Sequence, residues 1–307
     1  MNGLRHHIEQ YLSLRRALGF KLERAGRLLA DFADFAEQTG TDTVTVDMAV
    51  AWASLPAQAS PVWAAQRLGV VRGFARYLHT VDATAEIPPA DLLDARIRRA
   101  TPYLYSDADI TALMAAAAAL PHPLRAATFA TLIGLLAVTG LRASEAMRLD
   151  RGDIDPAQGL LTVRDTKFGK SRQLYLHSTT LDALADYGRR RDRLCPSPAT
   201  PSVFVSTSGA RLCHATIQPT FRRLLDQAGV GQDEARRPRI HDLRHSFAVR
   251  TLLRWYQDGH DVQERIPALS TYLGHVDPGA TYWYLSGSPQ LLALAAERLE
   301  AVFGSSS

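Results

Sequence analysis

The sequence has 307 residues, of which 46% are hydrophobic and 21% charged, with a formal net charge of +4 and a pI near 9.2. The length predicts two domains, the composition is that of an ordinary globular protein, and the basic pI permits nucleic-acid binding. No apolar run reaches the roughly 20 residues that span a bilayer, and the polar start lacks the apolar core of a signal peptide, so we expect a cytoplasmic protein.

Two residue types are scarce. The cysteines, Cys195 and Cys213, are too few for a disulfide framework, so free thiols are expected. Lysine occurs only at Lys21, Lys167 and Lys170, and all other basic residues are arginine. Arginine keeps its proton near neutral pH, whereas a lysine with a lowered pKa can release one. Two of the three lysines within one short segment therefore point to a site that needs a proton donor.

The first part of the chain predicts a bundle of four short helices. Apolar residues recur at helical spacing in four stretches, which begin near Ile8, Leu28, Met48 and Trp63. Gly40 follows the second stretch and suits the left-handed end of a helix. Four such helices can enclose a small core of their own.

The helical spacing then breaks at a linker. Ile87-Pro88-Pro89 cannot lie inside a helix, because proline lacks the N–H group and clashes with the preceding turn. We therefore assign residues 1–85 to a helical domain, 86–100 to the linker and 101–307 to a second domain.

The second domain is predicted to be mostly α with a small antiparallel β-sheet. Ser106 resembles a helix N-cap supported by Asp109, and Gly140 suits a helix end. Two strands, 160–165 and 172–177, flank a turn that contains glycine. Helices are expected at about 107–119, 123–138, 179–193, 214–228, 241–258, 261–273 and 288–303.

Four separated segments of this domain carry reactive side chains. Each is ordinary alone, since most arginines and hairpin lysines are solvated charges and a tyrosine beside tryptophan usually packs in a core. The segments are Thr139-Gly140-Leu141-Arg142-Ala143-Ser144-Glu145, the hairpin with Lys167, His241-Asp242-Leu243-Arg244-His245, and Leu273-Gly274-His275 with Tyr284 nine residues later.

Together these side chains fit one reaction, the transfer of a phosphodiester. Two arginines can grip its non-bridging oxygens, and histidines can donate to the same oxygens or move protons. A lysine can protonate the departing oxygen, and a tyrosine can attack phosphorus and hold it covalently. Because the arginines supply the positive charge and the covalent bond conserves energy, we expect neither a cofactor nor a metal.

The four segments, in this order, resemble the signature of the tyrosine recombinase (phage integrase) family, strongly over about residues 100–290. The resemblance implies an N-terminal core-DNA-binding domain and a C-terminal catalytic domain. It also implies roles for single residues. Arg142 and Arg244 would bind the scissile phosphate, and Glu145 would lie near the first of them. His241 and His275 would assist, with His241 as the proton acceptor. Lys167 (or Lys170) would be the general acid, and Tyr284 would form a 3′-phosphotyrosyl bond.

The resemblance further implies the partners. A member of this family would act on duplex DNA at a specific recombination site, as a homo-tetramer and with accessory proteins in some systems. The interval from His245 to Gly274 is long for compact members, which favours an integrase or transposase of a mobile element. Candidate contacts to the DNA backbone are Arg222, Arg223, Arg236, Arg237 and Arg239.

Three other interpretations stay open at the level of sequence. His241 and His245 are four residues apart and could share a metal, as in a metal-dependent phosphoesterase. A regulator could keep the fold and bind DNA without catalysis. A type IB topoisomerase would use closely similar chemistry. A covalent DNA adduct that forms in the presence of a chelator would separate these classes.

Overall fold

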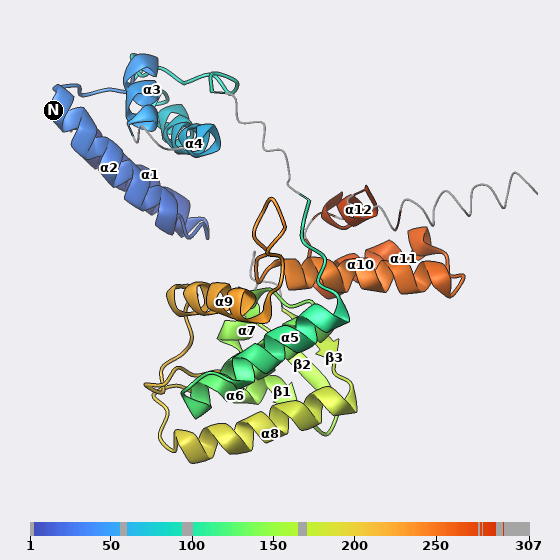
Figure 1. Ribbon diagram of the computed structural model, residues 1–307. Helices are drawn as coiled ribbons and strands as arrows, with labels where there is room; N and C mark the ends of the chain where they lie inside the picture. Colours follow the sequence, from blue (N-terminus) through green and yellow to red (C-terminus); the bar gives the residue numbers. More distant parts are fainter. Residues whose placement is uncertain are drawn as a thin grey trace, which may run out of the picture. The chain divides into compact units, whose positions relative to one another are not determined.

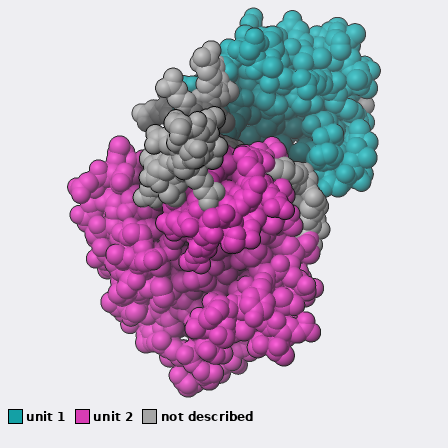
Figure 2. Space-filling view, turned by 90° about the vertical axis from the view of Figure 1, so that its right-hand side faces the viewer, with its two compact units in different colours: residues 1–100 teal, residues 101–307 magenta. Residues whose placement is uncertain are grey.

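The computed structural model describes residues 3–55, 60–93, 101–164, 171–275, 277, 279–286 and 291. The chain divides into two compact units, unit 1 (residues 1–100) and unit 2 (residues 101–307), which Figure 2 colours separately. The prediction of a mostly helical protein with one small antiparallel sheet is confirmed. None of the helices within these ranges is long and apolar enough to cross a membrane.

Unit 1 contains the four predicted helices (Figure 1), which are α1 (Leu4–Ala17), α2 (Glu23–Thr39), α3 (Val46–Ser54) and α4 (Pro61–Leu78). Their apolar faces enclose Phe32, Trp52 and Phe74, all fully buried. As predicted, α2 ends at Gly40, where φ is +68°. The buried Arg67 donates to Asp31 and to the backbone carbonyl of Trp52, so its guanidinium is bound by groups of unit 1.

Unit 2 is built around one central helix. α6 packs against α5, α7, α8 and α10, and most of its side chains are buried. α12 packs against α10 and α11. The helices are α5 (Asp107–Ala118), α6 (Pro123–Thr139), α7 (Ala143–Arg148), α8 (Ser178–Leu194), α9 (His214–Ala228), α10 (Asp242–Gln257), α11 (Val262–Leu273) and α12 (Gly279–Ser286).

The sheet of unit 2 has three antiparallel strands in the order β1-β2-β3, with β1 at Ile154–Asp155, β2 at Leu160–Val163 and β3 at Arg172–Tyr175. β2 and β3 pair in a register that places Leu161 opposite Leu174, and both side chains are buried. The predicted hairpin between these strands is confirmed, and its turn, residues 165–170, lies outside the described residues.

Four short elements were not predicted, namely α7, the 3₁₀ helix η1 (Arg151–Asp153), β1 and α12. Each has at most eight residues, which is too short for an apolar repeat to stand out. The predicted helix at 288–303 lies outside the described residues except for Leu291, which is buried. By contrast, the capping box at the start of α5 is confirmed. The backbone N–H of Asp109 donates to Ser106 Oγ at 3.1 Å, and that of Ser106 donates to Asp109 Oδ2 at 2.8 Å.

Gly140 ends α6 in the left-handed conformation, with φ of +62°. A Cβ atom there would lie 2.4 Å from Phe247 Cδ1. We expect Gly140→Ala to destabilise the protein by roughly 3 kcal/mol, since backbone strain and overpacking add. Gly229 is a matched control, because it ends α9 at φ +66° and the nearest atom to a Cβ there would be Gln232 Nε2 at 4.0 Å. Urea unfolding should show a loss of about 1 kcal/mol for Gly229→Ala, and equal losses for the two variants would contradict the role of Phe247.

Candidate active site

The turn after α6 positions Arg142. The left-handed Gly140 reverses the chain, and Arg142 becomes the N-cap residue of α7. The carboxylate of Glu145 reaches back to this cap, where Oε2 accepts from the backbone N–H of Arg142 at 3.0 Å and Oε1 accepts from its Nη1 at 2.7 Å. Arg142 Nη2 also donates to the carbonyl of Gly274 at 3.0 Å. The guanidinium is therefore fixed by two protein groups, although the side chain remains 29% exposed.

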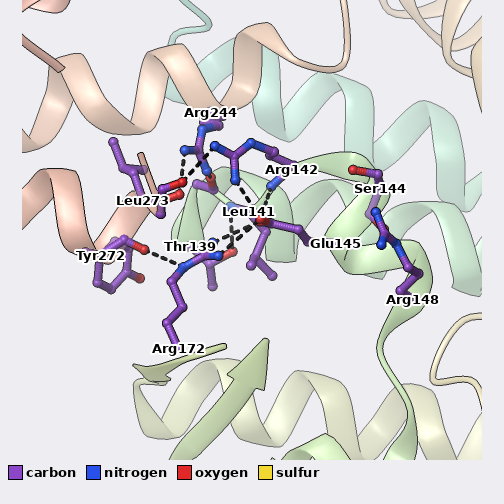
Figure 3. Close-up of polar contacts among 12 residues, drawn as sticks. Thr139, Leu141, Arg142, Ser144, Glu145, Arg148, Arg172, Arg244, Tyr272 and Leu273 are labelled. Atoms are coloured by element: carbon purple, nitrogen blue, oxygen red, sulfur yellow. Dashed lines mark hydrogen bonds and ion pairs between the residues drawn. The ribbon is translucent and has the colours of Figure 1, made fainter. Parts of the chain in front are cut away.

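Arg244 lies in the first turn of α10 and is only 2% exposed. Its Nη1 donates to the carbonyl of Gly140 at 2.8 Å, and its Nη2 donates to the carbonyl of Leu273 at 2.6 Å (Figure 3). Burial and the neighbouring Arg142 cation lower the pKa of Arg244 to about 10, so it stays charged at neutral pH. Within the described part of the chain, no carboxylate pairs with this buried cation.

The C-terminal end of α11 brings these two arginines together. The last carbonyls of a helix have no partner within it and carry partial negative charge. Arg244 binds the carbonyl of Leu273 and Arg142 binds the next one, that of Gly274. Gly274 adopts φ of +69°, and His275 follows directly. Two arginines about a hundred residues apart in sequence thus meet beside a histidine.

A third arginine, Arg172 of β3, completes this cluster (Figure 3). Its Nη1 and Nη2 donate to the two carboxylate oxygens of Glu145 at 3.1 and 2.9 Å. Burial alone would raise the pKa of Glu145, but the ion pair with Arg172 and the contacts with Arg142 outweigh burial and lower the pKa to about 2. Three guanidinium cations and one carboxylate leave the cluster with a net charge of +2, which suits a bound phosphate.

Tyr284 and His275 lie on the same side of unit 2. Tyr284 of α12 is 3% exposed, and its ring stacks on that of His275 with centroids 6.1 Å apart. His275 Nδ1 and Thr281 Oγ1 form a hydrogen bond of 2.7 Å, which leaves Nε2 for another partner. Burial, Arg244 and Arg142 lower the pKa of His275 to about 4, so it is neutral at pH 7.

The hydroxyl of Tyr284 contacts His245, which was not among the predicted site residues. His245 Nδ1 lies 3.2 Å from Tyr284 Oη. His241, the predicted proton acceptor, occupies the N-cap position of α10 without a capping hydrogen bond from its side chain. Its ring packs edge-on against that of His245, with centroids 4.8 Å apart. Burial and the nearby His241 lower the pKa of His245 to about 3, so His245 is uncharged at neutral pH.

The remaining predicted residues fall in two places. Lys167 and Lys170 lie outside the described residues, while β2 and β3 lead to the turn that carries them. Four of the five candidate DNA-contacting arginines line an open groove of about 480 Å³ that also includes His241. Arg237 pairs there with Asp226 and Arg239 with Asp242, whereas Arg222 and Arg236 are exposed in the groove. Arg223 is exposed on α9 but does not line this groove.

The possibility of a metal site rests on His241 and His245. Among the described residues, no group of three or more histidine, cysteine, aspartate or glutamate side chains could hold a metal ion. Two imidazoles in edge-on contact do not make the four-ligand set that zinc prefers.

Sequence reasoning missed Arg172 and His245 as members of the site. Arg172 looks like one of many arginines, and only its position at the start of the strand after the lysine turn could have marked it. His245 belongs to the motif from His241 to His245, but the sequence suggests no role for it other than a metal ligand.

The low pKa of Glu145 predicts a pH dependence of stability. Because the folded-state pKa lies below the unfolded value of 4.5, the contribution is fully present above pH 4.5 and is lost as the pH falls towards 2. Between pH 5 and pH 3, wild type should lose about 2 kcal/mol more unfolding free energy than Glu145→Gln, measured by urea titration. The exposed Glu264→Gln control on α11 should follow wild type. Parallel pH profiles for wild type and Glu145→Gln would contradict this assignment.

Comparison with known proteins finds families, sequences and structures that are similar to this chain. A model described as the phage integrase family matches residues 104–290. The protein named "Putative integrase/recombinase y4rB" of Sinorhizobium fredii is 45% identical over 307 residues, which cover 98% of each chain. The tyrosine recombinase XerC of Alcanivorax borkumensis is 31% identical over 79% of this chain and 75% of its own. The structure of the Tn1549 transposon integrase in complex with transposon right end DNA matches with a TM-score of 0.66 and 17% identity, covering 96% of this chain and 98% of that one.

Proposed function

The chain belongs to the phage integrase family and is a tyrosine site-specific DNA recombinase, and we propose that it cuts and rejoins DNA through a 3′-phosphotyrosyl bond to Tyr284. One observation carries this proposal. Arg244 is a buried cation whose described contacts are carbonyl groups, and it lies beside Arg142 and near Tyr284. A buried charge without a counter-ion is costly, and a scissile phosphate would supply the missing anion.

In the proposed reaction, Arg142 and Arg244 hold the two non-bridging oxygens of one phosphate. The hydroxyl of Tyr284 attacks phosphorus, its proton passes to the His241–His245 pair, and the bond to the 5′ oxygen breaks. Lys167 protonates that leaving oxygen, and His275 donates to a non-bridging oxygen through Nε2. The net charge of +2 on the arginine–glutamate cluster offsets the negative charge that builds up on the equatorial oxygens. Religation is the same path in reverse.

The wider setting is proposed from the family and its relatives. Unit 1 would be the core-DNA-binding domain and unit 2 the catalytic domain. The partner would be duplex DNA with a specific recombination site, bound in the cytoplasm by a homo-tetramer, since exchange of two duplexes needs four cleavages. The long interval before His275 and the likeness to the structure of the Tn1549 transposon integrase favour a role for a mobile genetic element, with accessory proteins in some steps.

A covalent trapping experiment tests the function. Supercoiled plasmid carrying the DNA on both sides of the coding sequence is incubated with the protein and EDTA, and denatured with detergent. We expect a protein–DNA adduct joined through a 3′ phosphate, formed without metal because the arginines supply the charge. Binding without an adduct would favour the silent DNA-binding regulator. Cleavage that leaves no adduct, is absent in EDTA and is restored by magnesium would favour the phosphoesterase.

The groove beside His241 predicts a salt-dependent contact with the DNA backbone. Each phosphate contact contributes about 0.9 to the slope of log affinity against log salt concentration. The double variant Arg222→Gln/Arg236→Gln should therefore lower that slope by about 2, measured by fluorescence anisotropy with a random-sequence duplex. The control variant Arg189→Gln/Arg190→Gln removes the same charge from the exposed face of α8 and should keep the wild-type slope. Equal slopes for both variants would exclude the groove as a DNA contact.

A further inference from the structure

The C-terminal end of α11 is bound by three arginines, one on each of three successive carbonyl groups. Arg172 Nε donates to the carbonyl of Tyr272 at 2.7 Å, beside the contacts of Arg244 with Leu273 and of Arg142 with Gly274. Two of these arginines have a role in the proposed reaction. The proposed reaction gives no role to Arg172, although this residue belongs to the same cluster.

Among the described contacts, all three guanidinium nitrogens of Arg172 donate to protein groups, whereas only Nη1 and Nη2 do so in Arg142 and Arg244. The side chain of Arg172 is only 11% exposed. Arg142, by comparison, is 29% exposed. The fork of Arg172 is thus directed at Glu145 and at α11, not at the open side of the site.

Both groups that fix Arg142 are in turn braced by Arg172. The first is Glu145, which receives a bidentate ion pair from Arg172. The second is the carbonyl of Gly274, and the guanidinium of Arg172 packs directly beneath that residue. A Cβ atom at position 274 would lie only 2.8 Å from Arg172 Nη1, so the absence of a side chain there makes room for the arginine.

From this arrangement we infer that Arg172 is a positioning residue of the recombination reaction, which acts through Glu145 and Gly274 to hold the guanidinium of Arg142 against the scissile phosphate. The inference rests on the proposed function. A lysine could not replace it, because one ammonium group cannot span two carboxylate oxygens and a carbonyl in the plane of a guanidinium fork.

A double-mutant cycle tests this inference. The four proteins are wild type, Arg172→Gln, Arg142→Ala and the double variant. The measurement is single-turnover cleavage of a suicide duplex that contains the cleavage position located by the trapping experiment. We expect Arg172→Gln to slow cleavage on the order of 10- to 100-fold, as when groups that orient a ligand are removed, with the affinity for DNA within about 2-fold of wild type. In the Arg142→Ala background the same change should cost less than about 3-fold, because the residue through which Arg172 acts is gone.

Several outcomes are decisive. A full effect of Arg172→Gln in the Arg142→Ala background would show a merely structural role and overturn the inference, as would no effect in the wild-type background. Arg189→Gln, in an exposed ion pair on α8, is the matched control and should cleave like wild type. If thermal melting shows that Arg172→Gln does not fold, Arg172→Lys takes its place in the cycle with the same expectations. Failure of wild type to form any adduct would instead refute the proposed function.

Discussion

Tyr284→Phe is expected to abolish the covalent protein–DNA adduct while leaving folding and DNA binding intact. The substitution removes one oxygen atom and keeps the ring that stacks on His275. Loss of the hydrogen bond with His245 should cost about 1 kcal/mol of stability, whereas loss of the nucleophile should lower cleavage by about 10⁴-fold or more. Detergent trapping on labelled DNA measures the adduct, and electrophoretic mobility shift measures binding.

Tyr282→Phe provides the matched control for this experiment. Residues two apart on a helix point about 200° away from each other, and the two tyrosines of α12 differ accordingly. Tyr282 is 41% exposed and Tyr284 is 3% exposed. The Tyr282→Phe protein should form the adduct at the wild-type rate. If it fails to do so while Tyr284→Phe still traps DNA, the nucleophile is misassigned.

Arg244→Lys is expected to lower the cleavage rate by about 10² to 10³-fold, the cost of removing a preorganised donor from a transition state. The guanidinium spans the carbonyls of Gly140 and Leu273, and a lysine ammonium cannot bridge both while also facing a phosphate. A lysine buried at this place would also lose its proton more readily than arginine does. Single-turnover cleavage of a suicide duplex measures the effect.

Arg250→Lys on the same helix is the control for this substitution. Arg250 is 38% exposed and its Nη1 donates to Asp107 at 2.6 Å, so the variant keeps its charge in water. Its cleavage rate should stay within about 3-fold of wild type, as is usual for exposed ion pairs. Equal rates for wild type and Arg244→Lys would show that the fork of Arg244 is not needed in the transition state.

Those parts of the fold that depend on local chemistry could be predicted from sequence. The ends of α2 and α6 follow from Gly40 and Gly140, and the start of α5 follows from the pairing of Ser106 with Asp109. Each signal lies within a few residues of the feature that it specifies. The six-residue α7 gave no such signal, because it is too short for an apolar repeat and its N-cap residue, Arg142, is not one of the residue types that mark a helix start.

For the site, the sequence could predict only the residues that lie in recognisable motifs. The convergence of Arg142, Arg244 and His275 is found as the resemblance implies, whereas the roles of Lys167 and the order of proton transfers stay predictions. Apart from its place after the lysine turn, nothing in the sequence marks Arg172, because its importance arises from contacts with residues 27 and 100 positions away. A hydrogen bond to a backbone carbonyl leaves no motif in the sequence, because every residue has a carbonyl group.

The arginines bind α11 through backbone carbonyls, which every residue type provides. Arg172 and Arg244 recognise the carbonyls of Tyr272 and Leu273, so the tyrosine and leucine side chains do not take part in those hydrogen bonds. In a saturation library, position 272 should therefore tolerate other aromatic or large apolar residues that keep the stacking on Phe247, and position 273 other buried apolar residues. Gly274 has no such freedom, because both its left-handed backbone and the guanidinium beneath it exclude a side chain. We therefore expect substitutions of Gly274 and of the arginines to be the most damaging, whereas positions 272 and 273 of α11 should accept similar side chains.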